Sequence, residues 1–312
     1  MKRIPVVVVL ASLSFGATAL FVEYRRELAR ARLQASSGSR IAATACGPIE
    51  YGSEGEGPPV LVVHGAGGGF DQGLGFGRPL TEWGFRVVAP SRFGYLRTPL
   101  PRDASPESQG DAHACLLDAL HLDRVAVMGG SAGAPSAMQL CLRHPERCSS
   151  MVLVVPLAFA EKAAGGVPRS PSGMALFLME TTLRSDFGFW IASTFAPDSM
   201  VGSILATPPA DVAKADVDEQ RRVREMLRRI EPISWRAAGL RNDATVARTL
   251  TLFDLDLFQD SFSFKHCRKD ITGICVYIIA RTNQTAEKFL GVLLRQRLRW
   301  RGRRRLKSRT PK

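Results

Sequence analysis

Four short apolar runs constrain the fold of this chain more than any other feature. They cover residues 59–63, 86–90, 124–128 and 151–155 and are rich in valine and leucine. Apolar runs without alternation are typical of strands buried on both faces, as in a parallel sheet covered by helices. Helical patterns at residues 74–83, 105–120 and 134–143 separate the runs. The alternation predicts an α/β domain with its functional groups at the carboxyl ends of the strands.

The charge of the chain is concentrated at one end. The 312 residues are 45% hydrophobic and 23% charged, which suffices for a full globular core and excludes a collagen-like, disordered or disulfide mini-scaffold. The formal net charge is +13, but residues 281–312 contain 12 basic residues and one acid, so residues 1–280 carry only +2. The basic tail could bind anionic lipid or nucleic acid, but a solvated terminus is favoured and a nucleic-acid partner is not expected.

An apolar segment begins the chain. Residues 4–22 are 19 uncharged residues in a row, close to the length that crosses the hydrocarbon core of a bilayer. We expect a single-pass N-terminal membrane anchor. A cleaved signal is the alternative, since Ala17-Thr18-Ala19 fits a cleavage site, and the protein would then be secreted or periplasmic. Basic residues flank the run on both sides, so the orientation stays open.

The six cysteines show no pattern of a metal site, because no C-x-x-C pair occurs. No metal and no cofactor are therefore expected. Most of the cysteines are expected to be buried thiols. For a body outside the cytoplasm, Cys141 and Cys148 are the pair expected to form a disulfide.

A serine stands at the end of the third apolar run. Gly129-Gly130-Ser131-Ala132-Gly133 follows residues 124–128 directly and precedes a helical pattern. In the pattern G-x-S-x-G, small neighbours let the chain turn so sharply that the serine hydroxyl stands exposed above the sheet. Ser131 is therefore the candidate nucleophile.

A glycine-rich turn follows the first run. His64-Gly65-Ala66-Gly67-Gly68-Gly69 can direct backbone N–H groups at a developing oxyanion. The N–H group of Ala132, with that of Ala66 or Gly67, would form an oxyanion hole. The spacing does not fit a phosphate-binding loop, since no G-x-x-x-x-G-K occurs here.

Residues 46–249 resemble the α/β-hydrolase fold family. The resemblance rests on the loop 64–69, on Ser131, on the segment 91–98 and on residues 142–147. It implies a mostly parallel sheet with helices on both faces, a serine nucleophile and a helical cap inserted at about residues 157–240. An apolar lining of such a cap favours a hydrophobic acyl or alkyl substrate. The aromatic residues of this region serve equally well as ordinary core.

The C-terminal part departs from the family. A serine hydrolase needs an acid and then a histidine after the serine. Residues 274–283 resemble the late strand that the family's acid follows, but Thr282 and Asn283 stand there. His144 is expected to cap a helix. Asp254 or Asp256 as acid and His266 as base would preserve the chain order.

The composition changes at the same border. Residues 1–250 contain 34 alanines, whereas residues 251–312 contain two. We interpret the C-terminal part as a diverged replacement or a shifted reading frame.

The sequence predicts four segments. They are an anchor or signal at 1–24, a linker at 25–45, a hydrolase domain at 46–290 and a basic tail at 291–312. The predicted function is ester hydrolysis of a small apolar substrate through an acyl-enzyme on Ser131. The alternatives are an impaired hydrolase-fold protein that binds a small apolar ligand, and a basic-tailed protein that binds membrane or nucleic acid.

Overall fold

The computed structural model describes residues 4–157, 184–205, 207–250, 263–265 and 276–280. The chain divides into two compact units. The described residues of Met1–Ser37 and Val167–Ala237 form a helical unit, and those of Gly38–Gly166 and Ala238–Lys312 form a sheet unit. Each unit is described by itself below.

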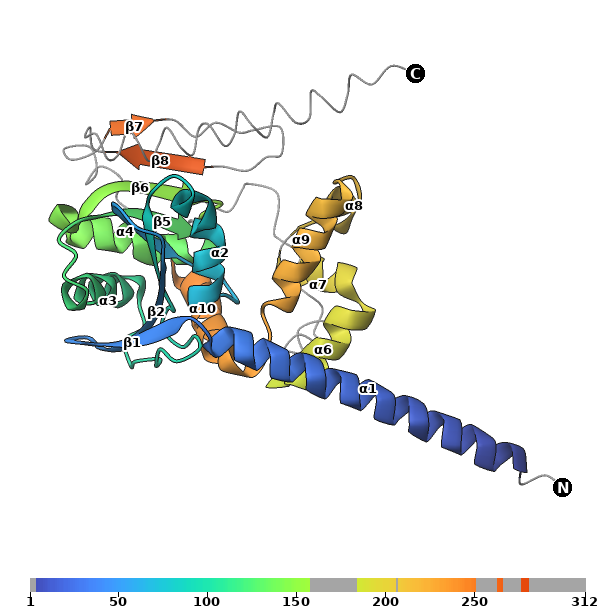
Figure 1. Ribbon diagram of the computed structural model, residues 1–312. Helices are drawn as coiled ribbons and strands as arrows, with labels where there is room; N and C mark the ends of the chain where they lie inside the picture. Colours follow the sequence, from blue (N-terminus) through green and yellow to red (C-terminus); the bar gives the residue numbers. More distant parts are fainter. Residues whose placement is uncertain (1–3, 158–183, 206, 251–262, 266–275, 281–312) are drawn as a thin grey trace, which may run out of the picture. The chain divides into compact units, whose positions relative to one another are not determined.

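The sheet unit contains one eight-stranded sheet in the order β1-β2-β4-β3-β5-β6-β8-β7 (Figure 1). Its strands are β1 (Ser39–Thr44), β2 (Gly47–Glu54), β3 (Pro59–Val63), β4 (Arg86–Pro90), β5 (Val125–Gly130), β6 (Cys148–Val154), β7 (Ser263–Lys265) and β8 (Val276–Ala280). The four central strands β4, β3, β5 and β6 are parallel, and the margins pair antiparallel. The predicted α/β architecture is confirmed, with parallel strands at the centre of the sheet.

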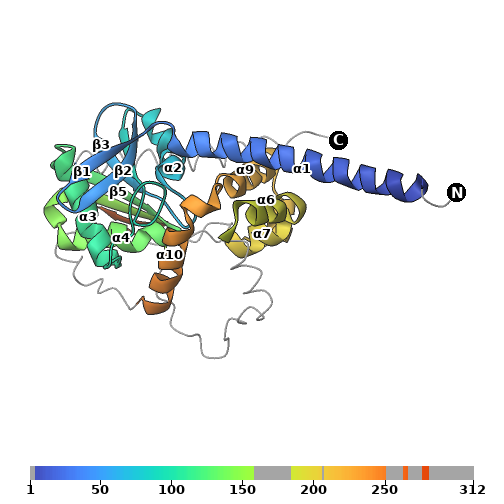
Figure 2. The same cartoon turned by 90° about the horizontal axis from the view of Figure 1, so that it is seen from below.

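Helices cover both faces of this sheet. They are α2 (Phe70–Thr81), α3 (Pro106–Ala119) and α4 (Ala134–Arg143), with short 3-10 turns at η1 (Ser131–Gly133) and η2 (Pro145–Arg147). Helix α10 (Ala237–Thr249) contacts the loop after β4, where the N–H of Gly239 donates to the carbonyl oxygen of Gly94. Val60 and Val62 pack in one cluster with Leu80 of α2, and Leu61 and Val63 pack in another with the apolar residues of α3 and α4. Figure 2 shows α3 and α4 together on one side of the sheet. Strands buried on both faces explain why the sequence runs are continuously apolar.

The helical unit consists of α1 (Ile4–Ser36), α6 (Asp186–Phe195), α7 (Pro197–Ile204), α8 (Pro209–Ala213), α9 (Val217–Arg228) and the 3-10 turn η3 (Ile233–Trp235). Two of its helices begin at polar side chains: before α6, Ser185 accepts a hydrogen bond from the N–H of Gly188, and before α9, Asp216 accepts one from the N–H of Glu219. Residues 25–45, expected to be a linker, instead form the second half of α1 and strand β1. Arginine, alanine and leucine in that stretch are good helix formers, which explains the continuation.

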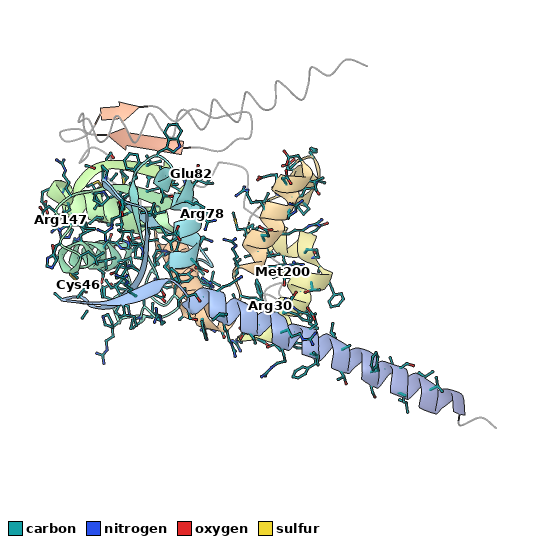
Figure 3. All side chains as sticks on the ribbon, in the orientation of Figure 1. Arg30, Cys46, Arg78, Glu82, Arg147 and Met200 are labelled. Atoms are coloured by element: carbon teal, nitrogen blue, oxygen red, sulfur yellow. A yellow bond between two sulfur atoms is a disulfide. The ribbon has the colours of Figure 1, made fainter. Side chains whose placement is uncertain are left out.

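Two disulfides join elements of the sheet unit. Cys141 pairs with Cys148, the pair expected for a body outside the cytoplasm, and Cys46 pairs with Cys115, which was not expected. The expectation that most of the six cysteines are buried thiols is therefore wrong, because four of them form disulfides. Cys46 lies next to β1 (Figure 3). The first pair closes a chain segment of 69 residues and the second a segment of 7, so the two constrain the unfolded chain to different degrees.

Removing the long-range disulfide should therefore cost more stability than removing the short one. The chain-entropy relation gives about 4 kcal/mol for Cys46→Ser with Cys115→Ser and about 2 kcal/mol for Cys141→Ser with Cys148→Ser. Urea unfolding of both double variants, followed by circular dichroism, measures the difference. Equal losses would show that native-state contacts, not loop closure, set the contribution.

A buried histidine links α3 to the start of α4. The Nε2 atom of His113 lies 3.3 Å from Oγ of Ser136, which donates to the carbonyl oxygen of Gly133. The hydroxyl of Ser136 therefore accepts from His113, and Nδ1 of His113 has no partner in the described structure. Burial, together with the positive charge of Arg92, lowers the pKa of His113 to about 3.

We expect His113 to make the protein less stable as the pH falls below 6.5. The unfolded chain then binds a proton that the folded chain does not take up until about pH 3, so the free energy of unfolding falls by up to about 1.4 kcal/mol per pH unit. Urea unfolding between pH 7 and pH 4 should show a shallower fall for His113→Phe. The matched control is His121→Gln at a surface turn, which should keep the steeper fall.

Candidate active site

Ser131 occupies a strained and exposed turn between β5 and α4. Its φ angle is +46°, in the left-handed region that L-residues rarely adopt, and its side chain is exposed although the residues around it are buried. The N–H group of Leu157 donates to the carbonyl oxygen of Ser131 at 3.0 Å and holds the turn. Such an exposed serine on a strained strand-to-helix turn is the geometry of a nucleophile elbow.

The small residues around Ser131 are required by close packing. A Cβ atom at Gly133 would overlap the carbonyl oxygen of His64, and one at Gly129 would lie 2.7 Å from Cβ of Ala137. A Cβ atom at Gly65 would lie 3.2 Å from Cβ of Ser131. The glycine-rich loop and the serine turn are therefore in direct contact at the carboxyl ends of β3 and β5.

The loop 64–69 presents one exposed backbone position. The N–H group of Gly65 donates to Oε1 of Gln72 at 2.9 Å, and that of Gly67 donates to the hydroxyl of Tyr95 at 3.3 Å. Ala66 between them is exposed, and no hydrogen bond engages its N–H group within the described residues. Of the two N–H groups predicted for the oxyanion hole in this loop, that of Gly67 already has a partner in the protein.

His64 orders the loop through both ring nitrogens. Its Nε2 atom accepts from the N–H of Arg92 at 2.9 Å, so the ring proton is on Nδ1, which donates to the carbonyl oxygen of Gly65 at 2.7 Å. The ring of His64 makes a T-shaped contact with the ring of Tyr95, with the centroids 4.8 Å apart. A histidine whose Nε2 accepts from the backbone is neutral and is held in place, as a structural role requires.

A buried ion pair holds the glycine-rich loop 64–69 in place. Arg92 forms a two-pronged pair with Asp243 of α10 at 2.7 and 2.8 Å, and it donates to the carbonyl oxygens of His64 and Gly65. Arg92 and Asp243 are 6% and 7% exposed. Although burial alone lowers the pKa of Arg92, Asp243 raises it above the ordinary value, so the guanidinium stays charged.

Tyr95 joins the same network. Its hydroxyl donates to Oδ2 of Asp243 at 2.5 Å and accepts from the N–H of Gly67. Burial, followed by the negative charge of Asp243, raises the pKa of Tyr95 well above its ordinary value. Asp243 thus binds both Arg92 and Tyr95, the two side chains that bind the loop. Sequence reasoning missed Asp243 because no motif surrounds it, and only the need of the buried Arg92 for an acid could have indicated it.

The other predicted residues have different positions. His144 ends α4, as expected, and its Nε2 lies 2.8 Å from Oδ1 of Asp111. Asp254 and His266 lie outside the described residues, as do Asp256, Thr282 and Asn283.

The strand directions bear on where those residues enter the sheet. β8 runs antiparallel to β6, with Ala280 opposite Ser150, so β8 ends at the edge opposite Ser131. β7 is antiparallel to β8 and therefore parallel to β6, so it runs toward the edge of Ser131 and reaches Lys265, opposite Ile278. His266 is the next residue in the chain.

Removing the carboxylate of Asp243 should unfold the sheet unit more easily. Asp243→Ala leaves Arg92 as an unpaired buried charge, and the expected loss is about 3–5 kcal/mol of unfolding free energy. Asp118→Ala breaks the pair of Arg147 with Asp118, whose side chain is 66% exposed, and should cost less than about 1 kcal/mol. Urea unfolding measures both. Similar losses in the two variants would contradict the anchoring role of Asp243.

Known proteins share this architecture. The family model of the alpha/beta hydrolase fold matches residues 58–248. An alpha/beta hydrolase fold protein from Nakamurella multipartita has 30% sequence identity and a TM-score of 0.56, covering 70% of this chain and 77% of that one. Uncharacterized hydrolase YcgS of Bacillus subtilis is 35% identical over 34% of this chain, and 2-hydroxymuconate semialdehyde hydrolase of Pseudomonas putida is 32% identical over 43%. The matches span 37% and 52% of those two relatives. The chain belongs to the alpha/beta hydrolase fold family.

Proposed function

We propose that this protein is a membrane-anchored serine hydrolase that cleaves carboxylic esters of small apolar substrates through an acyl-enzyme on Ser131. The observation that carries the proposal is the strained, exposed turn of Ser131, packed directly against the glycine-rich loop. Strained backbone at a nucleophile is retained where the surrounding structure enforces it, as the overlaps at Gly129 and Gly133 do here.

In this mechanism, the Oγ atom of Ser131 attacks the ester carbonyl carbon while a base takes its proton. The carbonyl oxygen becomes an oxyanion that accepts hydrogen bonds from the N–H groups of Ala66 and Ala132. Collapse releases the alcohol, which receives the proton from the base, and leaves the acyl-enzyme. Water then attacks the acyl-enzyme, giving the acid and free Ser131. The N–H of Ala66 is the better second donor, because that of Gly67 binds Tyr95.

We propose His266 as the base and Asp254 as its acid. Three of the other histidines have structural positions: His64 holds the loop, His113 is buried, and His144 pairs with Asp111. The direction of β7 supports His266, because β7 runs toward the edge where Ser131 lies and His266 is the next residue. β7 is three strands from β5, about 14 Å at the usual strand spacing.

The anchor is α1, and the sheet unit lies outside the cytoplasm. Among the described residues, one helix is long and apolar enough to cross a membrane, and it is near the N-terminus. The two disulfides favour an oxidising compartment for the sheet unit. They therefore favour an anchor whose C-terminal side faces away from the cytoplasm, an orientation that the flanking basic residues leave open.

A second candidate is hydrolysis of a carbon–carbon bond. It is favoured by the similarity to the 2-hydroxymuconate semialdehyde hydrolase of Pseudomonas putida. Assays of short aryl esters and of 2-hydroxymuconate semialdehyde, run side by side, distinguish the two reactions by their relative kcat/KM.

The proposal predicts that a fluorophosphonate probe labels Ser131. Peptide mass spectrometry of the labelled chain should place the adduct on Ser131, and Ser131→Ala should abolish labelling and lower kcat for an aryl ester by about 10⁴ or more. Ser199→Ala, an exposed serine on α7, is the matched control and should label normally.

His266→Ala tests the base separately and should lower labelling about as strongly as Ser131→Ala, because an unassisted hydroxyl is a weak nucleophile. A folded protein that stays unlabelled would overturn the enzyme proposal and favour a hydrolase-fold protein that only binds its ligand.

A further inference from the structure

Helix α1 changes character along its length. Its apolar part is exposed, with Leu13 and Phe15 at 65% and 78% exposure, whereas Tyr24, Leu28 and Ala35 are buried in the helical unit. The spacings of four and seven residues place these three on one face of the helix. The second half of α1 therefore packs on the helical unit, while the first half has no protein around it among the described residues.

The contacts between α1 and α6 fix the direction of α6. Asp186, at the start of α6, pairs with Arg32 at 3.2 Å. Four residues later, the Nε1 atom of Trp190 donates to Glu27 at 2.5 Å, and the Trp190 ring lies 5.6 Å from that of Tyr24. Trp190 therefore lies nearer the apolar run of α1 than Asp186 does. The ring of Phe187 also lies 4.9 Å from that of Tyr24, so α6 crosses α1 at an angle, as Figure 1 shows.

The end of α6 therefore approaches the apolar run. Leu20, inside that run, packs against the cluster of Tyr24, Leu28 and Trp190. Phe195 is five residues beyond Trp190, about 7 Å further along α6 at 1.5 Å per residue. Its side chain is 66% exposed, and Ala196 beside it is exposed too.

We propose that the end of α6, residues 191–197, contacts the lipid bilayer at the boundary between headgroups and acyl chains. The bilayer is the expected partner because α6 packs on α1. If α1 is anchored in the membrane, the exposed end of α6 is held close to the apolar residues of α1. Aromatic and apolar side chains favour that boundary. The inference rests on the proposed anchoring by α1.

The charges nearby fit an anionic bilayer. Arg25, Arg26 and Arg30 are exposed on α1 just beyond the apolar run, where they attract anionic headgroups. Figure 3 labels Arg30 on this helix. Asp198 is exposed at the start of α7, so the contact is confined to the boundary and the segment does not enter the hydrocarbon core.

A fluorescent probe on Phe195 tests the contact. The full chain carrying Cys267→Ser, Cys275→Ser and Phe195→Cys is labelled with bimane and placed in nanodiscs of phosphatidylcholine and phosphatidylglycerol. Lipids with a spin label near the headgroup should quench this probe roughly twofold or more relative to an unlabelled bilayer. The matched control is Val217→Cys at the start of α9, which is also apolar, 69% exposed and in the same unit, and its probe should be quenched little.

The outcomes separate the two proposals. Flotation of the chain with vesicles, with quenching at Phe195 and not at Val217, supports both. Flotation without quenching at Phe195, or with equal quenching at both positions, overturns the lipid contact and leaves the anchor intact. A chain that does not float with vesicles overturns the anchor and the lipid contact together, whatever its esterase activity.

Discussion

The ion pair between Arg92 and Asp243 is the interaction on which the rest of the candidate site depends. Two buried charges in a two-pronged pair are costly to place in a protein interior unless every donor has a partner, and here the remaining donors of Arg92 bind the carbonyl oxygens of the glycine-rich loop. The hydrogen bonds that Arg92 needs in the protein interior are thus the same ones that hold the glycine-rich loop in place. The pair ties α10, far along the chain, to the turn after β3, and the position of the exposed Ala66 N–H follows from it.

The backbone and the neighbours of Ser131 are linked to the same ion pair. Ser131 has a positive φ, and the backbone of His64 and the side chain of Ala137 leave no room for side chains at Gly133 and Gly129 beside it. His64 in turn is oriented by the backbone N–H of Arg92. Ser131 and the glycine-rich loop are therefore positioned by one connected set of contacts. For the proposed reaction, such a fixed arrangement reduces the reorganisation required when charge develops on a substrate.

The sequence predicted those parts of the fold that are written in local patterns. Residues 59–63, 86–90 and 134–143 match β3, β4 and α4, because apolar runs and helical spacing are local properties. Asp243 was missed because its role exists only when α10 packs against Tyr95. We predict a linker from the sequence where the second half of α1 lies, although the spacing of Tyr24, Leu28 and Ala35 is typical of a helix with one buried face.

The direction of β8 shows a limit of a different kind. An apolar run identifies a strand but not the direction in which it crosses the sheet, and β8 crosses antiparallel to β6. β8 therefore ends at the edge away from Ser131, and Thr282 and Asn283 come after that end in the sequence. β7 runs toward the edge of Ser131, and β8 begins there, with Val276 opposite Val154. These directions favour the proposed base His266, directly after β7, over any residue after β8.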